Sequence, residues 1–236
     1  MATGRWTGRR TKAFGVRAPS AAEGDLGGGL SKGVVGAMAM NTEGLLAVGT
    51  FNREAGMVDT NTEGGMVVKL ALPKEEGAGV TQVKFHPEPS KGNYMVVASR
   101  KSDVLHVFDV RNPNSLLATL VGRQGMTQQR LGIDITENGE VWAGGIDGLV
   151  RVWEGLGIGA GRIHPSLDWR AHEDAIGGIG LHPGGAGVLA SCAGSRHFDD
   201  DKKITDPSHQ DNRSSDNGTV KYGAEASDAM LKVYML

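Results

Sequence analysis

The chain has 236 residues, of which 39% are hydrophobic, 22% are charged and 37 are glycine. It is long enough for about one or two domains with a buried core, and its apolar runs are far shorter than the ~18 residues that span a bilayer. The formal net charge of −2 excludes a global basic field as a sign of nucleic-acid binding, although a local basic patch remains compatible with it.

Residues 1–30 form the first predicted unit, a basic and irregular N-terminal segment. Its basic residues precede the first acidic residue, Glu23, and are Arg5, Arg9, Arg10, Lys12 and Arg17. We interpret this segment as a solvated basic terminus, with a phosphate-seeking arm as the alternative.

Residues 31–236 contain four copies of one β-rich unit. The repeating inner segments end about 46 to 50 positions apart, and they are Val34–Ala39, Val80–Phe85, Arg130–Ile135 and Ile176–Leu181. A period of this length with strands inside it is typical of a β-propeller blade. The sequence therefore predicts a repeat of small antiparallel sheets rather than helical hairpins.

The second copy shows the unit most completely. Its strands are separated by turns rich in proline, glycine and aspartate, and we expect them at Val80–Phe85, Tyr94–Ser99, Val104–Asp109 and Ser115–Leu120. The corresponding segments of the other copies are Leu45–Gly49 and Met66–Leu70, then Glu140–Gly144 and Leu149–Glu154 around an Asp147-Gly148 turn, then Val188–Ala193 and Leu231–Tyr234. Endings such as Phe108-Asp109 and Trp153-Glu154 are degenerate forms of the Trp-Asp ending of WD40 repeats.

The predicted fold class is therefore all-β, a WD40 β-propeller with about four recognisable blades and no long helix. Within it, residues from about 197 to 226 are poor in large aliphatic side chains and read as a disordered insertion. The fourth blade lacks an outermost strand of its own, and Thr11–Arg17 is the local candidate to supply it. We expect the blades to form part of a larger ring.

The blades resemble the telomerase Cajal-body WD-repeat proteins, a family that includes a fungal splicing-associated branch. The resemblance rests on Gly44–Phe51, Gly79–Pro87, Gly122-Arg123 followed by Thr127–Leu131, Leu181–Pro183 and Leu189–Arg196. Its most specific element is the Gln-Gln-Arg entry at Gln128–Arg130, after Gly122-Arg123 where a generic repeat carries Gly-His. The resemblance implies a seven-bladed, non-enzymatic ring that recognises small nuclear RNA or telomerase RNA.

From this resemblance we expect a scaffold, not an enzyme, that binds small nuclear or Cajal-body RNA and supports ribonucleoprotein assembly or localisation. The implied partners are that RNA and ribonucleoprotein proteins, without a membrane, and the implied location is the nucleus, in Cajal bodies or nucleoplasm, with the cytoplasm left open. The alternative is a protein-only WD40 interaction platform without RNA binding, which the near-neutral charge allows equally.

Candidate RNA-binding residues lie near the ends of the predicted strands, which open onto a rim of the propeller. They are Arg100, Lys101, Arg123, Gln128, Gln129, Arg130 and Arg196. Guanidinium groups at such a rim can bind phosphates in a fork or stack on unpaired bases. Inter-blade ion pairing with Asp103 or Asp134 is the alternative role for the arginines.

The sequence offers no set of nucleophile, base and oxyanion donors, so we expect no catalytic residue and no cofactor. We assign His172 a structural role, bonded to a turn aspartate, and place His86 and His182 in surface turns before proline. The run Asp199–Asp201 lacks the ligand spacing of a calcium loop, and a single cysteine, Cys192, excludes both an internal disulfide and a CxxC zinc site.

Overall fold

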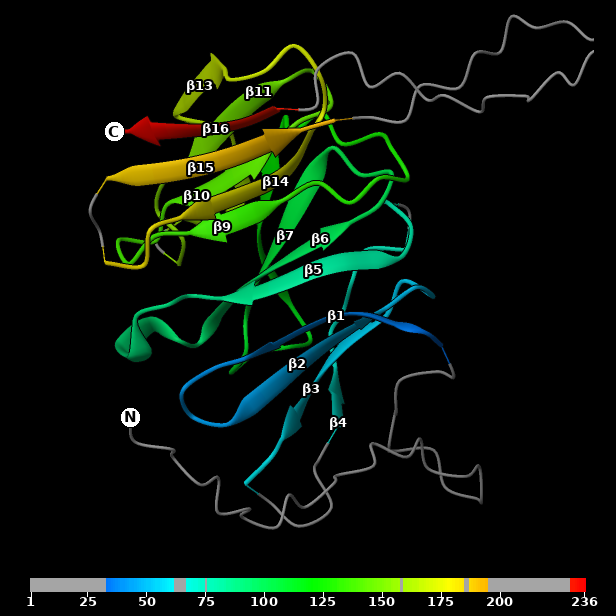
Figure 1. Cartoon of the computed structure of the whole chain (residues 1–236). Helices are drawn as coiled ribbons and strands as arrows, with labels where there is room; N and C mark the ends of the chain where they lie inside the picture. The colour runs from blue at the N-terminus through cyan, green and yellow to red at the C-terminus, as the bar shows by residue number, and fades with distance from the viewer. Residues whose placement is uncertain (1–32, 62–66, 75, 158, 185–186, 195–229) are drawn as a thin grey trace, which may run out of the picture.

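The computed structural model describes residues 33–61, 67–74, 76–157, 159–184, 187–194 and 230–236 (Figure 1). The basic segment at 1–30, the candidate strand Thr11–Arg17 and the insertion at about 197–226 lie outside these residues. Across the described ranges the secondary structure consists of β-strands and one short 3₁₀ turn, η1 (Pro89–Lys91), with no α-helix. None of the described elements is a helix long and apolar enough to cross a membrane.

The strands form four sheets, which we call blades 1 to 4 and which confirm the predicted all-β WD40 propeller (Figure 1). Blade 1 contains β1 (Val35–Met40), β2 (Leu45–Thr50), β3 (Ala55–Asp59) and β4 (Val67–Lys69). Blade 2 contains β5 (Val80–Phe85), β6 (Tyr94–Ser99), β7 (Val104–Asp109) and β8 (Leu116–Val121). Blade 3 contains β9 (Ile133–Ile135), β10 (Val141–Gly144), β11 (Leu149–Trp153) and β13 (Leu167–Arg170), and blade 4 contains β14 (Ile176–Leu181), β15 (Val188–Ala193) and β16 (Met230–Met235).

Four strands depart from the sequence expectation. The third strand of blade 1, β3, and the fourth strand of blade 3, β13, were not predicted, because Ala-Gly and charged residues interrupt their alternation. The strand β12 (Gly161–Ile163) leaves its own blade and pairs in parallel with β8 at the outer edge of blade 2. The inner strand predicted at Arg130–Ile135 begins only at Ile133, so the residues before it form a loop.

The blades repeat each other in detail. The inner strands of blades 1, 2 and 4 each shift register at the same place, between Val35 and Ala37, Val80 and Gln82, and Ile176 and Gly178. This shared irregularity aligns the blades residue by residue. Equivalent positions can therefore be compared directly between them.

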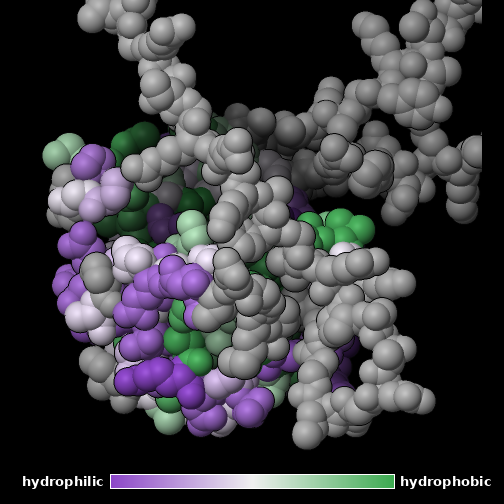
Figure 2. Space-filling view, turned by 90° about the horizontal axis from the view of Figure 1, so that it is seen from below, coloured by the Kyte–Doolittle hydropathy of each residue, from purple (hydrophilic) through white to green (hydrophobic). Residues whose placement is uncertain are grey.

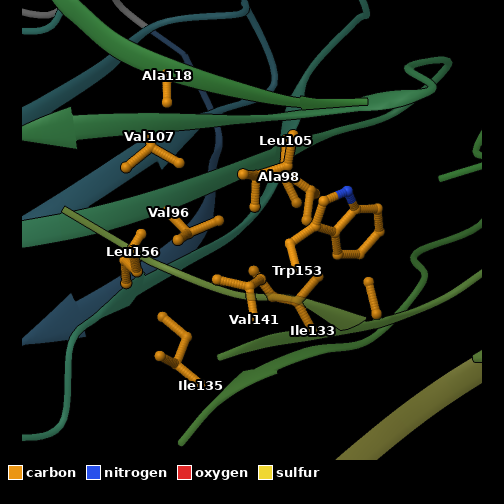
Figure 3. Packing of buried hydrophobic residues seen from close by; sticks show 12 residues of the cluster. Val96, Ala98, Leu105, Val107, Ala118, Ile133, Ile135, Val141, Trp153 and Leu156 are labelled. Carbon is orange, nitrogen blue, oxygen red and sulfur yellow. The ribbon is translucent and has the colours of Figure 1, made fainter. Parts of the chain in front are cut away.

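The core lies between neighbouring blades, in three hydrophobic clusters. Figure 3 shows the cluster between blades 2 and 3, where the indole of Trp153 packs among aliphatic side chains of both sheets. The Trp153 Nε1–H also donates a hydrogen bond of 3.1 Å to the carbonyl of Val121. Each blade thus depends on its neighbour to bury its apolar face.

Polar contacts also join the blades near the inner strands. The Gln82 side chain accepts a hydrogen bond of 2.9 Å from the backbone N–H of Ile133. The carboxylate of Asp134 receives the Lys84 ammonium from blade 2 at 2.7 Å and the backbone N–H of Leu181 from blade 4 at 2.8 Å. The Asp134 carboxylate of blade 3 is therefore hydrogen-bonded to both neighbouring blades, blade 2 and blade 4.

Candidate nucleic-acid interface

The β8–β9 loop, residues 122–132, crosses the turns at one end of blades 2 and 3. Backbone hydrogen bonds run from Lys101 N–H to Thr127 O (2.9 Å) and from Ile146 N–H to Gln124 O (2.9 Å). The Asp103 carboxylate accepts a further bond of 2.6 Å from the N–H of Gly125. These contacts fix the loop against the β6–β7 turn, which brings residues distant in sequence onto one surface.

This surface, which we call the loop surface, is defined by its exposed side chains Lys101, Gln124, Met126, Gln128 and Arg130. Two of its residues, Lys101 and Gln124, have positive φ angles of 48° and 57°, which are typical of tight turns. The loop surface therefore groups three of the predicted RNA-binding residues, and the sequence analysis had not singled out Gln124 and Met126. The sequence could have pointed to Gln124 and Met126 only through their position between two predicted residues, Arg123 and Gln128.

Arg100 lies beside this surface, against blade 1. Its guanidinium stacks over the Phe51 ring at 4.4 Å from the centroid, a cation–π contact that is worth about 1 kcal/mol when partly desolvated. The Arg100 side chain is half-buried, and its buried Nε has no hydrogen-bond partner. The exposed Phe51 ring and Arg100 thus add an aromatic and a cationic group beside the loop surface.

Arg123 does not belong to the exposed rim, which corrects the prediction for this residue. It is 2% exposed, and its Nη2 donates a hydrogen bond of 2.6 Å to the carbonyl of Leu131. Burial lowers its pKa to about 10, partly offset by the negative charge of Asp103, so the side chain is still a cation at neutral pH. Arg123 is a buried support of the β8–β9 loop because the loop folds over it.

Gln129 and Arg196 have different positions. The Gln129 side chain is half-buried, and its Nε2 donates a hydrogen bond of 2.7 Å to the carbonyl of Gly194 at the end of β15. This contact ties the loop to blade 4. Arg196 lies outside the described residues, two positions beyond Gly194.

The alternative role of inter-blade ion pairing is realised by a residue other than the predicted arginines. Asp134 pairs with Lys84 across blades 2 and 3, while Asp103 accepts its hydrogen bond from the Gly125 backbone. The exposed side chains of Lys101 and Arg130 form no ion pair with another of the described residues. Their charges face solvent, where they are free to meet an anion.

The three histidines that the sequence analysis singled out lie in the core or in turns. His172 is fully buried, and its Nε2 lies 2.8 Å from Ser191 Oγ, which agrees with a structural role. The expectation had named a turn aspartate as its partner, whereas this contact is to a serine. His182 is exposed as predicted, whereas His86 is buried, so the surface role predicted for His86 is wrong. Both bind their own turn, since Nδ1 of each accepts a backbone N–H two residues on.

A groove of about 580 Å³ lies between the outer parts of blades 1 and 2. Its lining combines the apolar Leu70 and Leu72 with the charged Arg53, Glu54, Lys69 and Lys74, of which Lys69 and Glu54 form an ion pair. The Arg53 guanidinium is already held by the carbonyls of residues 73, 74 and 76. Among the described residues no group of histidine, cysteine or carboxylate side chains is arranged to hold a metal ion.

No family model matches the chain. It is similar to "Telomerase Cajal body protein 1" of Mesocricetus auratus and of Rattus norvegicus, with 29% identity over 170 residues, which is 70% of this chain and 30% of each relative. It is also similar to "Guanine nucleotide-binding protein negative regulator 1" of Schizosaccharomyces pombe, with 35% identity over 108 residues, 46% of this chain and 26% of that protein. The chain thus spans about 30% of the length of the telomerase Cajal body relatives.

Among solved structures, the computationally designed protein Ika4 matches with a TM-score of 0.53 and 18% identity, over 69% of this chain and 86% of that one. At this identity the likeness concerns the fold alone. The four described sheets have the arrangement of a WD40 propeller. Together with these relatives, they confirm the resemblance of this chain to the telomerase Cajal-body WD-repeat proteins.

Proposed function

We propose that the chain is a scaffold whose loop surface binds small nuclear or Cajal-body RNA, telomerase RNA included, and supports its assembly or localisation in the nucleus. The observation that carries this proposal is the grouping of exposed Lys101, Gln128 and Arg130 on one hydrogen-bonded surface. Unpaired ammonium and guanidinium groups bind phosphates, and amide side chains bind base edges. The Phe51–Arg100 stack lies beside them as a platform for an unpaired base.

The net charge of −2 requires that binding depend on this local patch rather than on the whole surface. The proposal therefore assigns direct contact to Arg100, Lys101, Gln128 and Arg130, and Gln129, bonded to Gly194, extends the surface toward blade 4. Arg196 stays a predicted contact outside the described residues. Arg123 supports the loop from below and makes no direct contact. The partners that follow are small nuclear RNA and the proteins of its ribonucleoprotein particle.

The experiment compares Lys101→Glu/Arg130→Glu with the wild type for binding of a small nuclear RNA at several salt concentrations. Loss of two phosphate contacts makes the plot of log association constant against log salt concentration shallower, by about 1.4 in slope for single-stranded RNA. The affinity of the variant is also lower at every salt concentration tested. The matched control is Arg162→Glu, an exposed arginine on β12 outside the loop surface. An unchanged affinity and slope for the double variant, or an equal loss for Arg162→Glu, contradicts the proposal.

A protein-only interaction platform is the second candidate, and the groove between blades 1 and 2 favours it. Its apolar side chains and open backbone groups suit an extended peptide. Crosslinking in cells followed by RNA sequencing separates the two candidates. Recovery of background RNA alone, together with co-purified proteins, supports the platform.

A further inference from the structure

The outer edge of blade 2 is covered by a strand that belongs to another blade. The strand β12 lies in the connection 154–166 between β11 and β13 of blade 3, yet it pairs in parallel with β8. The register places Ile163 beside Leu120, and the Ile163 side chain packs against the cluster between blades 2 and 3. The fold itself therefore adds a parallel strand to the outer edge of one blade.

Blade 1 has an equivalent outer edge, formed by β4, the last strand of its sheet (Figure 1). The pairing of successive strands makes Lys69 of β4 equivalent to Thr119 of β8. By the same pairing Leu70 is equivalent to Leu120. These two leucines are 3% and 2% exposed, and each belongs to the cluster that joins its blade to the next. The residues that β12 meets in blade 2 thus have counterparts in blade 1.

The edge of β4 also has backbone groups that point outward. The N–H of Leu70 donates a hydrogen bond of 2.9 Å to the carbonyl of Ala55, so Leu70 bonds inward to its own sheet. Because residues of an antiparallel strand alternate in this respect, the N–H and carbonyl of Lys69 point to the outer side. No backbone partner meets Lys69 on that side among the described residues. In blade 2 the equivalent Thr119 lies beside Arg162 of β12.

The length of the connection in the following blade explains why a groove lies along this edge. The long connection 154–166 of blade 3 lays β12 on blade 2, whereas the short connection 110–115 of blade 2 reaches only the end of β4. There the carbonyl of Pro113 accepts a hydrogen bond of 3.1 Å from the N–H of Ala71. The remaining space is the groove of about 580 Å³, whose lining includes Leu72. Figure 2, seen from the side of blade 1, shows hydrophobic surface set among hydrophilic surface.

We infer that this groove binds an extended segment of a partner protein, which adds to blade 1 as a parallel outer strand beside β4. The segment has the pattern of β12, in which small or polar residues precede a β-branched apolar residue. That apolar residue lies beside Leu70, as Ile163 lies beside Leu120. Backbone bonds at Lys69 supply affinity, and the apolar contact supplies selectivity.

Charge contributes little to recognition of the segment. Lys69 is already paired with Glu54, and the Arg53 guanidinium is held by backbone carbonyls. The inference gives the second candidate function, the interaction platform, a partner class and a binding mode. It uses no residue of the loop surface, so it holds or fails separately from RNA binding.

The test uses the full chain and a synthetic peptide with the sequence of residues 159–166, which contains β12. Titration of the labelled peptide, followed by fluorescence anisotropy, is expected to give saturable binding of one peptide per chain. The same peptide with Ile163→Asp is the control and is expected to bind at least about tenfold more weakly. Hydrogen exchange should slow at the Lys69 amide when peptide is bound, and stay unchanged at Thr119, which β12 already covers.

Two variants of one position separate the backbone contact from the side chain. Lys69→Pro removes the outward N–H and leaves the inward bond of Leu70, so at a strand edge it is tolerated, and it should weaken binding at least about fivefold. Lys69→Thr introduces the residue found at Thr119, loses the same ion pair with Glu54 and keeps the N–H, so it should bind as the wild type. If the proline variant does not fold, Leu72→Asp replaces it, with an expected loss of at least about tenfold.

Any one of several results overturns the inference. They are no saturable binding at millimolar peptide, equal binding of the Ile163→Asp peptide, equal affinity of the Lys69→Thr protein and the Lys69→Pro or Leu72→Asp protein, and protection of β8 instead of β4. Protection of the Lys69 amide in the full chain without peptide would show that the chain covers its own groove, which also overturns it. Lys101→Glu/Arg130→Glu changes no residue of the groove and is expected to bind the peptide as the wild type, whatever its RNA affinity.

Discussion

Replacement of Arg123 tests most directly whether this side chain supports the loop or contacts a ligand. Truncation to alanine leaves the buried carbonyl of Leu131 without its hydrogen bond, which costs about 1–3 kcal/mol. It also removes the apolar stem of a side chain that is 2% exposed and the cation near Asp103. Part of this loss in folding stability is recovered, because the variant no longer has to keep the Arg123 charge away from water. We expect a net destabilisation of about 3 kcal/mol.

For a domain of this size, 1 kcal/mol corresponds to about 2–4 °C in Tm, so Arg123→Ala is expected to melt about 6–12 °C below the wild type. Arg123→Met keeps an apolar stem of similar length and is expected to lose about 1–2 kcal/mol. Thermal unfolding followed by circular dichroism measures both variants. Met is the second variant in case the alanine chain does not fold.

RNA affinity of the folded Arg123→Met protein separates the two roles. We expect it to equal that of the wild type at every salt concentration, in contrast to Lys101→Glu/Arg130→Glu. An unchanged Tm with a weakened affinity and a reduced salt slope would refute the structural role of Arg123.

Three other perturbations are expected to affect stability. Asp134→Ala removes the acceptor of Lys84 and of the Leu181 N–H, so chemical denaturation should show a loss of about 2 kcal/mol, and Asp134→Asn about half of it. Gly148→Ala places a Cβ against the carbonyl of His172 at a φ of 75°, so its Tm should fall by at least about 4 °C. Burial lowers the pKa of His106 below its ordinary value of 6.5, so the unfolded chain takes up this proton first, and stability should fall as pH drops below 6.5. The decline should be shallower in His106→Gln.

Each of these has an outcome that contradicts it. Equal stability of Asp134→Ala and wild type would show that the bridge between three blades has no net value. A Gly148→Ala protein with an unchanged Tm would mean that the turn relaxes away from His172. An identical pH profile for His106→Gln would assign the decline to another group, such as His86, whose pKa burial also lowers.

Several strands were predicted with the bounds that the structure has. Alternating apolar residues between turn formers marked β5, β6, β7, β14 and β15 residue for residue. This succeeded because a strand and its turns are specified by nearby residues. The same reasoning missed β13, whose Asp168 and Arg170 interrupt the pattern, and could not foresee β12, because its pairing with β8 in another blade is a non-local event.

The candidate site was predicted as seven separate residues, and their burial could not be predicted with them. The sequence marked 122–131 as unusual, and the structure divided its residues between exposed Arg130, half-buried Gln129 and buried Arg123. Nothing local distinguishes the two arginines, because both follow a strand or precede one in a polar loop. Which of them is buried depends on how the loop folds across two blades.

By itself, the sequence determined the repeat, the antiparallel sheets and their turns, since these follow from alternation and from residues that bend the backbone. The tertiary structure alone decided which polar side chains hold the blades together and which face solvent. It also decided that Arg123 is buried while Arg130, in the same loop, is exposed. The physical reason is that burial depends on a neighbouring sheet, and the residue pattern of one blade is the same whether or not that neighbour is present.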